Sequence, residues 1–99
     1  MSVEFSEKKV AERVRVGVDF VRLLGTGESI VSAVVVASVL RGVDAAPAGL
    51  LNGACSVAGS NVWQELKDGV AGVYYTLEFA ATTNLGHVLI ERVTQEVIA

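Results

Sequence analysis

A stretch of alternating side chains in the C-terminal half of the sequence limits most strongly what this chain can fold into. Tyr75, Leu77, Phe79 and Ala81 fall on one face of a period-two ribbon, and the residues between them fall on the other. Aromatic and β-branched residues are frequent in it, as suits a half-buried strand. Glycines before the stretch and Asn84-Leu85-Gly86 after it are typical of turns, so it predicts the first strand of a β-hairpin.

Shorter runs of the same kind, separated by turn residues, predict the rest of the fold. We expect strands over residues 13–24, 29–40, 54–58, 61–66 and 88–97, with a loop or a crossing between sheets over residues 41–52. Residues 13–24 also carry a helical stripe of valines, but Gly17 would cost a helix interior about 1 kcal/mol, so we predict a strand. The run from Val34 to Val36 suggests burial on both faces of its strand.

Six to seven short strands predict an all-β fold, and one local pattern specifies it further. In Gly72-Val73-Tyr74-Tyr75-Thr76-Leu77, Tyr75 starts a strand two residues before a core position. This is similar to the corner of an immunoglobulin-like sandwich, with Leu77 in place of the half-cystine. We therefore predict an immunoglobulin-like antiparallel β-sandwich over residues 13–99, preceded by an N-terminal arm or edge strand over residues 1–12.

Composition supports strands and indicates contact with other chains. Nineteen of the 99 residues are Val, a residue that packs well on a pleated sheet. Apolar residues make up 52% of the chain and charged ones only 19%, against roughly 45–50% and about 25% in typical domains. This surplus of apolar residues indicates that other chains cover part of the surface.

Charge and cysteine content exclude several classes of partner. The formal charge is −3, and the basic residues cluster only at Lys8-Lys9 and at Arg13 and Arg15. Nucleic acid is therefore not an expected partner, because binding it requires a basic face. The N-terminus lacks the pattern of a signal peptide, and the longest apolar run is too short to span a membrane. The single Cys55 fits a small buried thiol in a chain made in a reducing cytosol.

No group of residues predicts catalysis or metal binding. Gly25-Thr26-Gly27 follows an apolar run but lacks the third glycine of a dinucleotide loop, which favours a simple turn. His87, the only His, has no ligand at metal-binding spacing, and nothing local supports a Cys55–His87 pair. We expect no enzyme activity, no cofactor, no metal and no small-molecule substrate.

Three other features are open to two interpretations each. Glu65 with Glu78, and Glu91 with Glu96, are possible carboxylate pairs, although solvated strand faces carry such residues routinely. Trp63 is either an interface anchor or packed in the core or on the sheet, and we prefer packing.

Two motifs, one in each half of the chain, resemble a known family. The first runs from Val18 to Ala33 and contains Leu24-Gly25-Thr26-Gly27-Glu28, and the second contains Gly72-Val73-Tyr74-Tyr75-Thr76 and Thr82-Thr83-Asn84-Leu85-Gly86-His87. Together they resemble the small immunoglobulin-like structural proteins of tailed bacteriophages, known as phage fiber–tail adaptor proteins. This chain departs from the family pattern at Asp68, where a glycine is usual, and at His87, where a basic residue is usual.

The resemblance implies a non-enzymatic virion structural protein, made in the host cytoplasm and present in several copies per particle. Its implied partners are other virion proteins: the connector, the tail or the fiber. A capsid decoration protein and a secreted immunoglobulin-like adhesion module are the alternatives, and the N-terminus weighs against the second. A small enzyme or ligand-binding barrel is less favoured, because the His, Asp and Cys cluster that it needs is missing.

We expect contacts between subunits on the N-terminal arm and on the sheet edges. The arm has few apolar residues and should not order itself alone, and the last strand has no strand after it in the chain. The expected interface residues are Val3, Phe5, His87, Val97 and Ile98.

Overall fold

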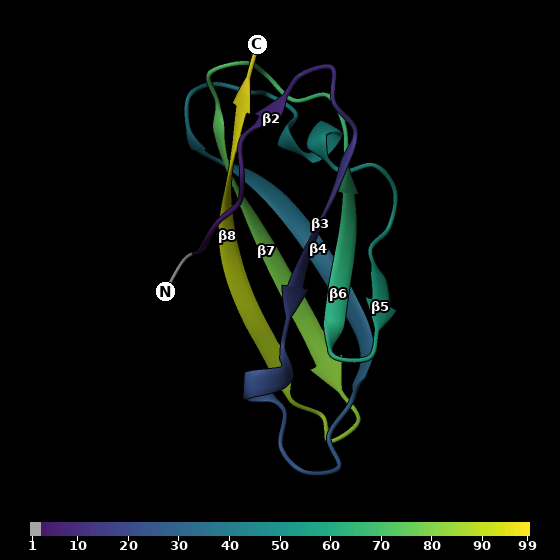
Figure 1. Ribbon diagram of the computed structural model, residues 1–99. Helices are drawn as coiled ribbons and strands as arrows, with labels where there is room; N and C mark the ends of the chain where they lie inside the picture. The colour runs from purple at the N-terminus through teal and green to yellow at the C-terminus, as the bar shows by residue number, and fades with distance from the viewer. Residues whose placement is uncertain (1–2) are drawn as a thin grey trace.

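Two β-sheets packed face to face make up the fold (Figure 1). A computed structural model describes residues 3–99, with side chains described from residue 5 on. The large sheet has the order β1-β8-β7-β4, with β2 also paired to β8, and the small sheet has the order β3-β6-β5. The strands are β1 Val3–Glu4, β2 Lys8–Lys9, β3 Val14–Asp19, β4 Ile30–Arg41, β5 Ser56–Ala58, β6 Asn61–Leu66, β7 Tyr74–Thr83 and β8 Val88–Ile98. The predicted all-β sandwich is confirmed.

The core lies between the two sheets, where the alternation in the sequence placed it. Tyr75, Leu77, Phe79 and Ala81 are all fully buried on the inner face of β7. Residues of the small sheet and the loops, among them Phe20, Leu50, Val62 and Leu66, complete the same apolar cluster. β7 pairs antiparallel with both β4 and β8, so its inward side chains have neighbours on both sides.

The hydroxyl of Tyr75 fastens the start of β7 to two loops. It donates to Asp44 Oδ2 at 2.6 Å and accepts from the amide of Val70 at 2.9 Å. Burial, and then the hydrogen bond to Asp44, raise the pKa of Tyr75 to about 12. The bond back to the main chain five residues upstream is the contact expected of a corner tyrosine.

Two segments end differently from the sequence prediction. The strand predicted over residues 13–24 stops at Asp19 and is followed by a 3₁₀ helix, η1 Val21–Leu23. Asp19 Oδ1 ends the strand by accepting from the Val21 amide and the Ser60 hydroxyl. The loop predicted over residues 41–52 contains a second 3₁₀ helix, η2 Pro47–Leu50, which brings Leu50 into the core. No helix in the part of the chain that the structure describes is long and apolar enough to cross a membrane.

The outer face of β4 is exposed, and the prediction of burial on both faces is wrong. Val35 and Ala37 point into the core, whereas Val34 is 61% and Val36 is 54% exposed. A run of valines satisfies either arrangement, because Val favours strands whether or not its side chain is covered. Among residues 5–99, nothing covers these two valines.

The N-terminal arm is docked along the second half of β8, so this part of β8 is not an open edge. β1 and β2 both pair parallel with β8, and the amide of Phe5 donates to the carbonyl of Thr94. The Phe5 ring meets Phe79 edge-on, with centroids 6.3 Å apart. Lys8 is buried, and its ammonium donates to the carbonyls of Lys9, Val10 and Asp68. The arm is therefore ordered by main-chain pairing and one buried cation as well as by its few apolar side chains.

Trp63 packs on the outside of the small sheet and takes no part in the core. It pairs in register with Gly17, and a Cβ on Gly17 would lie 2.3 Å from the indole ring. Arg15 stacks over the same ring at 4.8 Å from its centroid. Packing against the sheet, the preferred interpretation of Trp63, is what the structure has, and Gly17 is required because the ring lies directly over its Cα.

Candidate functional site

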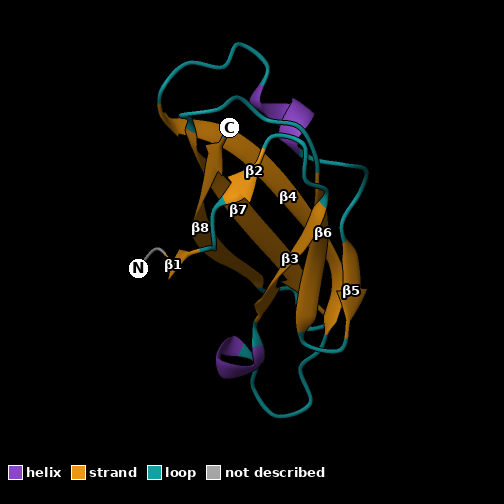
Figure 2. Cartoon of the chain, turned by 45° about the horizontal axis from the view of Figure 1, so that its top comes forward, coloured by secondary structure: helices purple, strands orange, loops and turns teal. Residues whose placement is uncertain are grey.

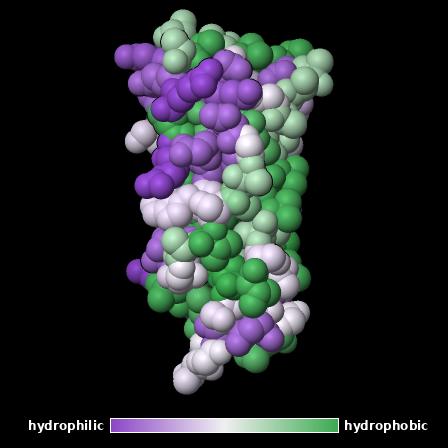
Figure 3. All heavy atoms as spheres, turned by 90° about the vertical axis from the view of Figure 1, so that its right-hand side faces the viewer, coloured by the Kyte–Doolittle hydropathy of each residue, from purple (hydrophilic) through white to green (hydrophobic). Residues whose placement is uncertain are grey.

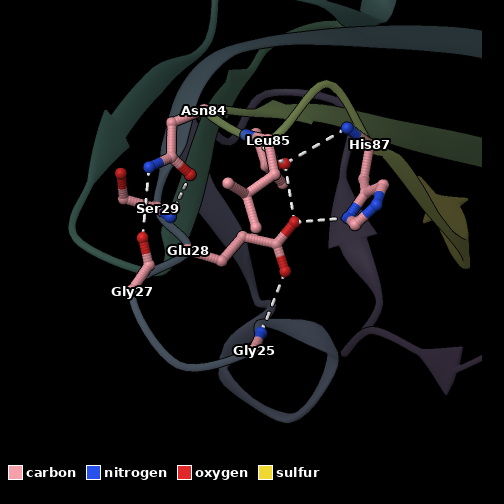
Figure 4. Close-up of polar contacts among 8 residues, drawn as sticks. Gly25, Gly27, Glu28, Ser29, Asn84, Leu85 and His87 are labelled. Atoms are coloured by element: carbon pink, nitrogen blue, oxygen red, sulfur yellow. Dashed lines mark hydrogen bonds and ion pairs between the residues drawn. The ribbon is translucent and has the colours of Figure 1, made fainter.

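Parts of the two sequence motifs that carry the family resemblance, residues 25–29 and 83–87, meet at one end of the sandwich. The loop between β3 and β4 and the β7–β8 hairpin lie side by side at the bottom of Figure 1, and Figure 4 shows their contacts. Asn84 Oδ1 accepts from the amide of Ser29, and its Nδ2 donates to the carbonyl of Gly27. The main chain adds a bond from the amide of Asn84 to the carbonyl of Ser29. We call residues 25–29 and 83–87 the tip.

Glu28 is the centre of the tip. Its Oε1 accepts from the amide of Gly25 at 2.9 Å, and its Oε2 accepts from the Thr83 hydroxyl at 2.7 Å. The same Oε2 lies 2.6 Å from Nδ1 of His87. The side chain of Glu28 is 4% exposed and that of His87 is 63% exposed. A solvent-facing imidazole therefore covers an almost enclosed carboxylate (Figure 4).

Hydrogen bonds stabilise the charged form of Glu28. The amide of Gly25 contributes most, followed by the Thr83 hydroxyl; burial opposes them, and His87 adds a smaller effect in their favour. Together they lower the pKa of Glu28 from 4.5 to about 2. At neutral pH the ionised carboxylate of Glu28 thus holds the two loops of the tip together through these contacts.

We expect acid to loosen the tip through Glu28. Because its pKa is about 2 in the folded chain and near 4.5 in the unfolded chain, its stabilising effect is complete above about pH 4.5 and is lost as the pH falls toward 2. Glu28→Gln does not titrate, so its urea midpoint should fall less than that of the wild type between pH 6 and pH 2.5. Asp19 and Asp44, whose pKa values are also lowered, are present in both proteins, so their contributions to the pH dependence cancel in the comparison. Equal falls in the two midpoints would contradict this role of Glu28.

In the glycine-rich turn, the amide of Gly25 already has a partner within the tip. The amide of Gly25, which a phosphate-binding loop would offer to its ligand, already donates to the carboxylate of Glu28. The thiol of Cys55 donates to the carbonyl of Ala33 while His87 contacts Glu28, so neither side chain reaches the other. In residues 5–99, no group of three His, Cys, Asp or Glu side chains is placed to hold a metal ion.

The acidic residues considered as carboxylate pairs lie on different sheets or on opposite faces of one strand. Glu78 is paired with Arg92 at 3.0 Å across the outer face of the large sheet, and Glu65 lies exposed on β6. Glu91 and Glu96 are both on β8, but the alternation of its side chains points them to opposite faces. Neither pair of acids shares a site.

The residues predicted to form an interface are divided between two regions. His87 is exposed at the tip, whereas Phe5 and Ile98 are half-buried along the arm and β8. The side chain of Val97 is fully buried in the core, so it offers nothing to another chain. The side chain of Val3 lies outside the described residues. Among the four described residues, only His87 has a largely exposed side chain.

Sequence reasoning missed an exposed surface with several large apolar side chains, which we call the outer face. It is the solvent side of the large sheet, and its register places Val34, Ala80 and Ile90 in one row and Ser32, Thr82 and Val88 in the next. Its exposed large apolar side chains are Val34, Val36, Leu40, Val88 and Ile90. Figure 3 shows apolar residues along its right-hand edge, the side on which β4 lies behind the small sheet in Figure 1. Exposed apolar side chains gathered on one face in this way are typical of interaction sites.

One ion pair interrupts the outer face. Glu78 and Arg92 lie in the row that begins with Val36, and they neutralise each other there. The outer face is thus apolar and without net charge at its middle, which suits the centre of a protein–protein contact better than a nucleic-acid or ion site.

Comparison with known proteins agrees with the motifs at the tip. A family model described as podophage GP4 fiber-tail adaptor protein gp77 matches residues 8–96 of the chain. The matched range includes both halves of the tip and every strand of the small sheet. No curated protein matches the chain. The resemblance drawn from the sequence motifs is confirmed.

Proposed function

Since the chain belongs to the podophage fiber-tail adaptor protein family, we propose that it joins the tail to a fiber protein as a non-enzymatic part of the virion. The match over residues 8–96 is the observation that carries this proposal, and the outer face supports it. A protein whose role is to hold neighbours needs surface that becomes covered only in the assembly. The family match favours this role over capsid decoration or secreted adhesion.

We infer further that the sandwich is immunoglobulin-like. The order β3-β6-β5 in one sheet and β8-β7-β4 in the other follows the B-E-D and G-F-C orders of that fold. The hydroxyl of Tyr75, bonded to the amide of Val70, supports the same assignment.

We also propose that several copies are present in each particle and that the outer face contacts the neighbouring virion protein. Val34, Val36 and Ile90 supply the apolar part of this contact, and their exposure in the single chain supports it. Burying such side chains in an interface is favourable by roughly 25 cal/mol per Å² of apolar surface removed from water.

A lysine on the outer face should weaken assembly without unfolding the chain. We expect Val34→Lys to lower incorporation into particles by about tenfold or more, because the interface would bury an unpaired ammonium. Val43→Lys is the matched control, since Val43 is 84% exposed in a loop outside the outer face. Both variants should unfold within about 0.5 kcal/mol of wild type, since both positions are exposed. Incorporation is measured by mass spectrometry of purified particles. Equal incorporation of the two variants would contradict the proposal that the outer face contacts a neighbouring protein.

A further inference from the structure

β3 presents main-chain hydrogen-bonding groups to an open edge. The amide of Phe20 donates to the carbonyl of Ser60, and the register continues from there to Val18 with Val62 and Val16 with Gln64. Hydrogen-bonded and non-hydrogen-bonded pairs alternate along an antiparallel ladder. The amides and carbonyls of Val14, Val16 and Val18 therefore face β6, and those of Arg15, Gly17 and Asp19 face away from it. Among the described strands β3 pairs with β6 alone (Figure 2).

A groove runs along this open edge, between β3 and the docked arm. It consists of two adjoining hollows of about 410 and 270 Å³ that share Phe5 and Gly17 in their walls. Arg15, Gly17 and Asp19, the residues whose main chain faces outward, all line it. We call it the β3 groove. Its remaining walls include apolar side chains from both sheets, namely Val14, Val16, Val18, Leu23 and Val93.

A buried acceptor without a donor lies in the wall of the same groove. Gln95 is fully buried on the inner face of β8 and lines the smaller hollow. Its Nε2 donates to the carbonyls of Ser6 and Glu96, whereas its Oε1 has no hydrogen-bond partner. Leaving such a group unsatisfied costs about 1–3 kcal/mol, so the site favours a ligand that carries an N–H donor.

We propose that the β3 groove binds an extended segment of the neighbouring tail or fiber protein, which adds to the small sheet as a strand beside β3. This rests on the proposed function, which supplies the neighbour. The segment's main chain bonds to the outward groups of Arg15, Gly17 and Asp19, and its alternate side chains enter the groove.

The pattern of hydrogen-bond donors and acceptors along β3 favours an extended peptide as the ligand of the β3 groove. The edge offers donors and acceptors in alternation, which a peptide main chain matches and a small anion or cation does not. Six residues of β3 fit a partner strand of about 20 Å. The side chain of Arg15 stacks on Trp63 on the outside of the sheet, so it leaves the edge open. On β8, the corresponding strand of the large sheet, the edge is already paired with β1 and β2 from Val93 to Ile98.

Arg15→Pro tests the proposal, with Arg15→Ala as its matched control. Both variants lose the stacked guanidinium, but only proline also removes the outward amide and places its ring at the edge. The bonds from Val14 and Val16 to β6 remain in both. Each purified variant is added to particles that lack the chain, and bound chain is counted by mass spectrometry. We expect Arg15→Pro to bind at least about tenfold more weakly than Arg15→Ala.

Equal binding of the two variants contradicts the proposal that the β3 groove binds a partner strand, but it does not affect the proposed function. Failure of the wild-type chain to bind such particles overturns both. Photo-cross-linking provides a second test in case the proline variant does not fold. Benzoylphenylalanine is introduced by Glu7→benzoylphenylalanine at the rim of the groove. The control is Ser56→benzoylphenylalanine on the exposed strand β5. A covalent adduct with a tail or fiber protein from position 7 only supports the proposal. An adduct with a second copy of the chain, or none at position 7, contradicts it.

Discussion

Leu77→Ala is expected to lower the free energy of unfolding by about 2–5 kcal/mol. Leu77 has no exposed surface, and it lies on the central strand of the large sheet between Ala37 of β4 and Val93 of β8. Strands on both sides restrict how far the core can collapse around the missing atoms, so a cavity remains. Urea denaturation followed by the fluorescence of Trp63 measures the change.

Val43→Ala provides the control for Leu77→Ala. Val43 is 84% exposed in a loop, and its truncation should change the free energy of unfolding by no more than about 0.5 kcal/mol. Similar effects of the two substitutions would show that the inner face of β7 is not the centre of the core.

The sequence predicted β7 and the core well because period-two alternation has one physical explanation. Tyr75, Leu77, Phe79 and Ala81 can share a face only if the chain is extended, and their apolar character requires that this face be buried. The sequence also singled out Tyr75, whose hydroxyl donates to Asp44 and accepts from the amide of Val70.

The exposure of the outer face was not predictable, because a run of consecutive valines is compatible with a strand covered on one face and with a strand covered on both. Val34 and Val36 are exposed only because no other part of residues 5–99 folds over β4. For residues 1–12 the sequence offered an arm or an edge strand, but it did not predict where the arm docks. Its order depends on parallel pairing with β8 and on the three carbonyls that bind Lys8, and neither leaves a period in the sequence.

The tip shows what a family motif adds to local patterns. Glu28 and His87 are 59 residues apart, so no local spacing reveals their contact. The motifs named both positions, and in the structure the imidazole of His87 covers the carboxylate of Glu28. The departure noted at Asp68 also has a structural reading: Asp68 has φ 51°, in the left-handed region that glycine adopts without strain.

Counting fiber protein on particles assembled without this chain tests the central claim most directly. If the chain joins the tail to the fiber, such particles should carry complete tails and essentially no fiber protein by mass spectrometry and electron microscopy. Adding the purified chain together with the fiber protein should restore fibers, with the chain in a fixed ratio to tails. A normal amount of fiber protein on particles that lack the chain would contradict the claim.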